Sequence, residues 1–163
     1  MADVYVTAGA KVYIGPAMAP GASDFVLADF ETSPPKSWVQ IGMVETIGTF
    51  GDTAQSVTFN AVGRRRVIKK KGSRDAGQMD LVMGIDPSDT GQTALRAAEA
   101  TDFDYAFKVE FNDKTSASGA ANSLRYFVGQ VLTAAEQLDG ADNIMKLNSS
   151  VGINSNVVRK ART

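Results

Sequence analysis

The side chains with the most chemical potential in this sequence are a run of cations and two pairs of carboxylates. Residues 64–71 read RRRVIKKK, with six basic side chains in eight positions. Asp86 and Asp89 flank one turn, and Asp139 and Asp142 flank a glycine. Such pairs could bind a cation or exchange protons, but aspartates at these positions are far more often turn formers and helix caps. We therefore predict no catalytic, metal-binding or cofactor-binding residue among them.

The composition excludes several classes of enzyme. The chain contains no cysteine and no histidine, which removes Cys/His zinc sites, thiol catalysis and Ser-His-Asp triads. The sequence has no P-loop, no dinucleotide-binding GxGxxG and no HExxH motif. These observations predict a protein that is not an enzyme and that needs no cofactor.

Length and net charge favour one domain with local rather than global electrostatics. A chain of 163 residues has the length of a single domain, so we expect one unit over residues 1–163. Its net charge of −1 creates no overall field that would recruit nucleic acid. The N-terminus lacks the features of a signal peptide, and no stretch approaches the roughly 20 apolar residues that span a bilayer. We expect no membrane partner.

Three interpretations of the basic run compete. It could be a solvated edge strand, whose cations block unwanted pairing. It could be a nucleic-acid patch, although basic runs are a weak signal and this one lacks the aromatic residues on which bases stack. It could also be a docking strand, whose cations meet acidic residues of an adjoining subunit, such as Asp75, Asp80 or Asp104. We favour the docking strand modestly over the edge strand, and both over the nucleic-acid patch.

Apolar residues alternate with polar ones along much of the chain, which is typical of half-buried strands. The most regular run places Phe103, Tyr105, Phe107, Val109 and Phe111 on one face, which predicts the core. Residues 124–132 are apolar on both faces, so this strand is either central or covered by another chain. The predicted strands are 38–44, 57–62, 65–71, 78–85, 103–111, 124–132 and 143–153, with shorter β-prone runs at 4–7 and 11–14, a turn at 72–77 and a mobile basic tail at 159–162.

One short helix interrupts the strands. Asp89 and Gln92 have the spacing of a capping box, with Asp89 at the N-cap, and residues 93–100 are rich in helix formers. Seven or so short strands with polar connections and one short α-helix predict a mainly β fold, either a sandwich or an open barrel.

The order of features in residues 46–98 is distinctive. A glycine-rich lead-in, a strand, the basic strand, a turn, a second strand and a capped helix follow one another, and the stretch contains the phrases KKKGSRDAG and DTGQTALRAA. This pattern resembles the tail tube proteins of long non-contractile-tailed bacteriophages and of phage-like particles. The similarity is strongest over residues 38–100.

The resemblance implies a structural virion protein that self-assembles. Subunits of that family form hexameric rings, whose strands complete an inner β-barrel, and the rings stack into a hollow helical tube. Passing double-stranded DNA and the tape-measure protein would be partners in the lumen, and tail terminator and tail tip proteins would be partners at the ends. The protein would be assembled in the bacterial host cytoplasm and reside in the virion tail.

Carried over by position, the resemblance also suggests where subunits meet. Strand pairs within 57–71 and 124–153 are candidates for the lumen-lining sheet. An extended N-terminal region, the loop 42–54 and a C-terminal arm would reach adjacent subunits or rings. The expected contact residues are Trp38, Phe50, Arg65, Arg66, Lys69, Lys70, Phe127 and Arg159.

Two other functions remain open at this point. The chain could be a nucleic-acid-binding β-barrel module that uses the basic run, or a tail terminator or connector protein that forms a single ring.

Overall fold

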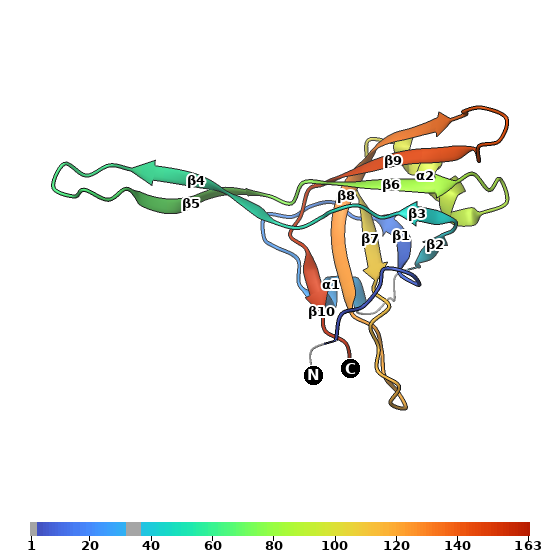
Figure 1. Ribbon diagram of the computed structural model, residues 1–163, viewed down its shortest axis with the longest axis horizontal. Helices are drawn as coiled ribbons and strands as arrows, with labels where there is room; N and C mark the ends of the chain where they lie inside the picture. Colours follow the sequence, from blue (N-terminus) through green and yellow to red (C-terminus); the bar gives the residue numbers. More distant parts are fainter. Residues whose placement is uncertain (1–2, 32–36) are drawn as a thin grey trace.

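The fold is built on one large antiparallel sheet. The computed structural model describes residues 3–31 and 37–163, and Figure 1 shows the sheet as a strongly curved body. Its strand order is β2-β1-β7-β8-β9-β6-β3, with β10 paired to one end of β8. The strands are β1 (Lys11–Ala17), β2 (Val39–Ile41), β3 (Val44–Thr46), β6 (Gln78–Gly84), β7 (Tyr105–Glu110), β8 (Leu124–Gln137), β9 (Lys146–Ile153) and β10 (Val158–Lys160). The predicted mainly β class is confirmed.

The two outermost strands of this sheet are neighbours in the sequence. Only Gly42 and Met43 separate β2 from β3, and such a short link spans about 10 Å at most. Met43 adopts a left-handed backbone with φ 55°, which redirects the chain between the two strands. The two edges of the sheet must therefore come close together, and the sheet curls into an open barrel. The predicted strand 38–44 is in fact divided at this link.

The main core lies inside the curl. Its buried side chains come from β1, β2, β6, β7, β8 and β9 and from helix α2 (Thr90–Glu99), which supplies Leu95 and Ala98. The helix lies very close to β2, because a Cβ added at Gly91 would stand 2.1 Å from the carbonyl oxygen of Gln40. Only glycine permits that approach. The large core side chains include Phe107, Phe127, Met79, Leu81, Met83 and Leu147.

The N-cap of α2 is where the sequence placed it. The Asp89 Oδ2 accepts a hydrogen bond from the Gln92 amide at 2.8 Å, and the helix begins at Thr90, directly after the predicted cap. The side chain of Gln92 is buried and donates to the carbonyl oxygens of Gly42 and Gly84 at 3.1 and 2.8 Å. Gln92 therefore ties the β2–β3 link to the end of β6.

A second, smaller core covers the outer face of β7 and β8. Ala106, Tyr126 and Val128 point to this side, and Phe30 and Val158 pack on them. Phe30 belongs to α1 (Leu27–Glu31), a one-turn helix that the sequence analysis did not predict. Both faces of β8 are thus covered by the chain itself, so the central position is the correct alternative for this strand.

The largest departure from prediction concerns β4 (Thr53–Phe59) and β5 (Ile68–Asp75). They pair only with each other and form a separate two-stranded sheet, which projects far from the body (Figure 1). Of β4, only Ala54 is even partly buried, so the predicted half-buried strand at 57–62 is wrong. The predicted turn at 72–77 is also too long, since β5 continues to Asp75 and the chain reverses just beyond it.

Three smaller expectations also need correction. Phe103 lies before β7 and is 64% exposed, so the apolar face of this strand is shorter than its sequence pattern. Met145 lies before β9 and is exposed as well. Arg159 and Lys160 form β10 rather than a mobile tail, because that segment pairs with β8 at Tyr126, Arg125 and Leu124.

The contrast between two phenylalanines gives a test of this core. Phe107→Ala should lower the free energy of unfolding by about 3–5 kcal/mol, because it leaves a cavity under fully buried neighbours. Phe103→Ala should lower it by about 0.5 kcal/mol or less, as at other exposed positions. Urea unfolding followed by circular dichroism measures both, and equal losses would contradict the assignment of Phe103 to the surface.

Candidate self-assembly surfaces

The projecting hairpin, which we call the arm (residues 52–75), exposes apolar side chains on a sheet that has nothing beneath it. Phe59 is 64% exposed and Val62 at the tip is entirely exposed, and Val57 and Val67 are also open to solvent. An isolated two-stranded hairpin is at best marginally stable in water. Apolar residues on such an element are expected where another surface covers them.

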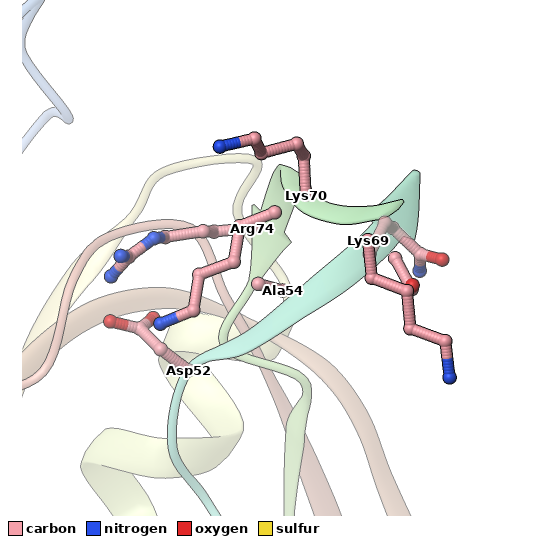
Figure 2. Close-up of a pocket in the computed structure, with 8 residues that line it drawn as sticks. Asp52, Ala54, Lys69, Lys70 and Arg74 are labelled. Atoms are coloured by element: carbon pink, nitrogen blue, oxygen red, sulfur yellow. The ribbon is translucent and has the colours of Figure 1, made fainter. Parts of the chain in front are cut away.

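The arm also concentrates positive charge. Seven cations stand between residues 52 and 75 against two carboxylates, Asp52 and Asp75, a surplus of five positive charges. Within the described ranges, the ion pairs lie elsewhere, at Arg96–Glu136, Lys146–Glu45 and Lys160–Glu31. Figure 2 shows Lys69 and Lys70 directed to different sides of β5, with Arg74 and Asp52 near the base of the arm beside a shallow hollow of about 400 Å³.

Four of the predicted contact residues lie on this arm. Arg65 and Arg66 are in the connection between β4 and β5, and Lys69 and Lys70 are in β5. All four are exposed. The structure therefore brings these residues together on one element, well away from the body of the same chain.

The predicted aromatic contacts have a different environment. Phe127 is 0% exposed and stacks on Phe107, with ring centroids 5.7 Å apart, so it is a core residue and has no surface to offer a neighbour. Trp38 is half-buried against Tyr126, and the Lys108 Nζ lies 5.1 Å from the centre of its indole ring. A core role accounts for both side chains. Phe50 packs on Phe127 from the edge of the core and keeps a partly exposed surface.

Phe50 and Arg159 both line an open groove at the base of the arm. This basic groove has a volume of about 690 Å³ and lies between the segment 48–52 and the start of β10. Two further arginines, Arg74 and Arg125, line it. Sequence analysis missed Arg125, because a single arginine inside an apolar strand carries no signal of what it faces.

The C-terminal strand that borders this groove is fastened to α1. The Glu31 Oε1 accepts hydrogen bonds from the Tyr126 hydroxyl and the Lys160 ammonium, both at 2.8 Å. Burial favours the neutral carboxyl, but the hydrogen bonds from Lys160 and Tyr126 outweigh it and lower the pKa of Glu31 below its usual 4.5. The ionised carboxylate thus helps to hold β10 in place.

The paired aspartates singled out in the sequence form local hydrogen bonds in turns or cap a helix. Asp86 accepts hydrogen bonds from the Ser88 hydroxyl and amide, which lower its pKa, and Asp89 caps α2. Asp139 accepts a hydrogen bond from Gln137. Across residues 3–31 and 37–163, no three acidic side chains gather in a way that could hold a metal ion. The same residues include no helix with the length and apolar character needed to cross a membrane.

Comparison with known proteins places the fold. No family model and no curated protein sequence matches this chain. Among solved structures, the SPP1 tail tube superposes with a TM-score of 0.64 at 14% identity, over 93% of this chain and 77% of that one. The chain has the tail-tube fold. The same fold occurs in a sheath/tube terminator of the extracellular contractile injection system PVC, with a TM-score of 0.67 at 9% identity over 99% and 100% of the two chains.

A third similarity extends the same group. A chain from the baseplate structure of the anti-feeding prophage superposes with a TM-score of 0.71 at 9% identity, over 99% of this chain and 98% of that one. At such low identities the tail-tube fold is what these proteins share.

The link between Glu31 and β10 predicts a pH dependence. A carboxyl whose pKa is lowered in the folded protein contributes stability above its unfolded pKa, and this contribution disappears as the pH falls through the folded value. The thermal unfolding midpoint of Glu31→Gln should therefore lie below that of the wild type at pH 7, and the difference should shrink below pH 4.5. Circular dichroism melts at pH 7, 5 and 3 test this. A difference that stays constant across that range would contradict it.

Proposed function

We propose that this protein is a structural subunit of a phage or phage-like tail, which self-assembles as stacked hexameric rings into a hollow tube. The tube would conduct double-stranded DNA and the tape-measure protein, and its ends would meet tail terminator and tail tip proteins. The protein would assemble in the bacterial host cytoplasm and remain in the virion tail. It has no catalytic role in this proposal.

The observation that carries the proposal is the arm. A two-stranded sheet with exposed Val57 and Phe59 and a surplus of five positive charges pairs with no further strand among residues 3–31 and 37–163. Its burial by a neighbouring copy would remove the apolar surface from water and place the cations against carboxylates. Arg65, Arg66, Lys69 and Lys70 are the contact residues of this element.

The body of the molecule supports the same proposal. β2 and β3 end the strand order of the main sheet, and such free edges can pair with another copy. Contacts between different surfaces of identical subunits close into rings when the rotation permits, and ring faces can then stack. Residues 1–163 would act as one tail-tube unit, with the N-terminal region, residues 42–54 and the C-terminal strand at its contacts.

A conduit for DNA also constrains the charge of its wall. Every phosphate bound by a lysine or arginine adds salt-sensitive affinity, so a lumen rich in cations would retain the passing duplex. We propose that acidic and neutral side chains dominate the lumen and that the cations of the arm are neutralised at a contact between subunits.

A second candidate function has a specific observation in its favour. The match to the PVC sheath/tube terminator covers 99% of this chain and 100% of the terminator. The match to the SPP1 tail tube covers 93% of this chain but only 77% of the tail tube chain. A terminator-like protein that forms one ring is therefore the main alternative. A nucleic-acid-binding module that uses the cations of the arm is the other.

Negative-stain electron microscopy of the purified, concentrated protein separates the three functions. Long hollow tubes are the expected result. Isolated rings would support the single-ring alternative. A particle that remains a monomer and retards duplex DNA in a gel would support the nucleic-acid module and overturn the proposal.

Charge reversal on the arm tests its role in assembly. Arg65→Glu with Lys69→Glu should reduce pelletable assemblies at least about tenfold at low salt, because like charges would then meet at the contact. Affinity for duplex DNA should change much less. The matched control is Arg96→Glu with Lys114→Glu, which reverses two exposed charges outside the arm and outside the other proposed contact regions. Normal polymerisation of the arm variant together with lost DNA binding would contradict the assignment.

A further inference from the structure

The basic groove at the base of the arm combines apolar and cationic walls. Phe50, Phe111 and Val157 are half-buried along it, so each leaves part of its apolar surface accessible. The guanidinium of Arg125 lies 4.5 Å from the centre of the Phe111 ring, and its Nη1 donates to the carbonyl oxygen of Leu124 at 2.9 Å. These contacts hold Arg125 in place at the groove.

The charge of the groove is not balanced by the chain that forms it. Arg74, Arg125 and Arg159 line it together with one carboxylate, Asp52, and the described ion pairs involve other residues. Burial is the main cause that lowers the pKa of Arg125, and the nearby positive charge of Arg159 lowers it further. A groove of this kind favours an anionic occupant that also carries apolar surface.

The same chain presents such a segment on the side of the body opposite the arm. Residues 138–145, the β8–β9 loop, project there (Figure 1). Asp139 and Asp142 give the loop two negative charges, and no cation lies within it. Leu138, Ile144 and Met145 are 66%, 74% and 54% exposed. The loop therefore offers exposed apolar side chains for the apolar wall of the groove and carboxylates for its arginines.

We infer that the basic groove of one subunit receives the β8–β9 loop of a second copy, with Asp139 and Asp142 directed at Arg159 and Arg74. This inference rests on the proposed function, since it names one contact of the self-assembling subunit. The two surfaces differ from each other, so the contact is head-to-tail and repeats from copy to copy around a ring.

The shapes of the two surfaces favour this pairing over the alternatives. The arm is itself a projecting hairpin exposed on both faces, so it cannot enclose the projecting loop, whereas the groove is concave. A nucleic acid would match the cations of the groove, but it would leave the apolar surface of the β8–β9 loop uncovered. A second copy covers the apolar surface of the loop and neutralises the cations of the groove in the same contact.

Mixing two reversed variants tests the contact. The groove variant is Arg74→Glu with Arg159→Glu, and the loop variant is Asp139→Lys with Asp142→Lys; all four side chains are exposed. Each variant alone should pellet at least about tenfold less than the wild type at low salt, because like charges then face each other. An equimolar mixture should recover assembly, since alternating the two variants pairs opposite charges at every contact, and a ring with an even number of subunits permits this.

The control for this experiment is the arm variant described above. Mixed with the loop variant, Arg65→Glu with Lys69→Glu should give no recovery, and recovery there would overturn the inference in favour of the arm as the partner of the loop. Assembly of either single variant at wild-type level would also overturn it. The inference would also be overturned if the groove variant assembled normally but no longer retarded DNA in a gel. Failure of the wild type itself to form any oligomer would instead count against the proposed function.

Circular dichroism melts of both variants confirm that they are folded before they are mixed. If Arg74→Glu with Arg159→Glu unfolds, Arg159→Glu alone serves as the groove variant, because Arg159 is exposed on a strand of three residues at the edge of the groove. Recovery on mixing remains the decisive measurement, since neither a folding defect nor an unrelated surface effect is reversed by adding a second defective variant.

Discussion

The structure depends on one strand that is buried on both faces. β8 pairs with β7 along one edge and with β10 and β9 in succession along the other. Phe127 and Val131 point into the main core, and Tyr126 and Val128 into the outer one. Since every backbone group of a buried strand needs a hydrogen-bond partner, the positions of its three neighbours are fixed by it. Both the groove beside β10 and the β8–β9 loop are placed by this strand.

A change in the pairing of β8 separates its buried half from its exposed half. The register with β9 shifts between Val131 and Thr133, which is the mark of a β-bulge and bends the strand. Just before this point, a Cβ on Gly129 would stand 2.4 Å from the carbonyl oxygen of Gly152, so the two backbones approach as only glycine allows. Beyond it, most of β8 is exposed, whereas β9 stays in the main core as far as Leu147, and the two strands lead to residues 138–145, which are exposed.

The sequence could predict those features whose cause is local. The N-cap at Asp89 follows from one side chain and the amide that it bonds, and the two apolar faces of β8 follow from the period of two along the strand. The same period misled the analysis at Val57 and Phe59, because alternation shows which side chains share a face but not what covers that face. Phe103 was misplaced for a different reason, since β7 begins only at Tyr105 and the alternation does not show where a strand starts.

The candidate site was predictable only in part, again for a physical reason. The cations at residues 64–71 are adjacent in the sequence and could be found by composition alone. The basic groove joins Arg74, Arg125 and Arg159, which are far apart in the sequence. Arg125 and Arg159 meet because β8 pairs with β10, and Arg74 joins them from the base of the arm. No local sequence pattern predicts that these residues lie together. Phe127 is the opposite case: it was predicted to contact another subunit, but it is buried in the core of its own chain.

The distribution of charge explains why a chain of nearly zero net charge would associate. The arm holds a surplus of five positive charges, and the whole chain has a net charge of −1, which leaves a net charge of −6 on the remainder. The arm extends away from the body, so these opposite charges cannot neutralise each other within one molecule (Figure 1). Contacts between identical copies can neutralise these charges, because each copy presents its positive arm to one neighbour and its negative surface to another. Separation of charge along a rigid fold thus favours directional contacts, and directional contacts between unlike surfaces are the kind that propagate into rings and tubes.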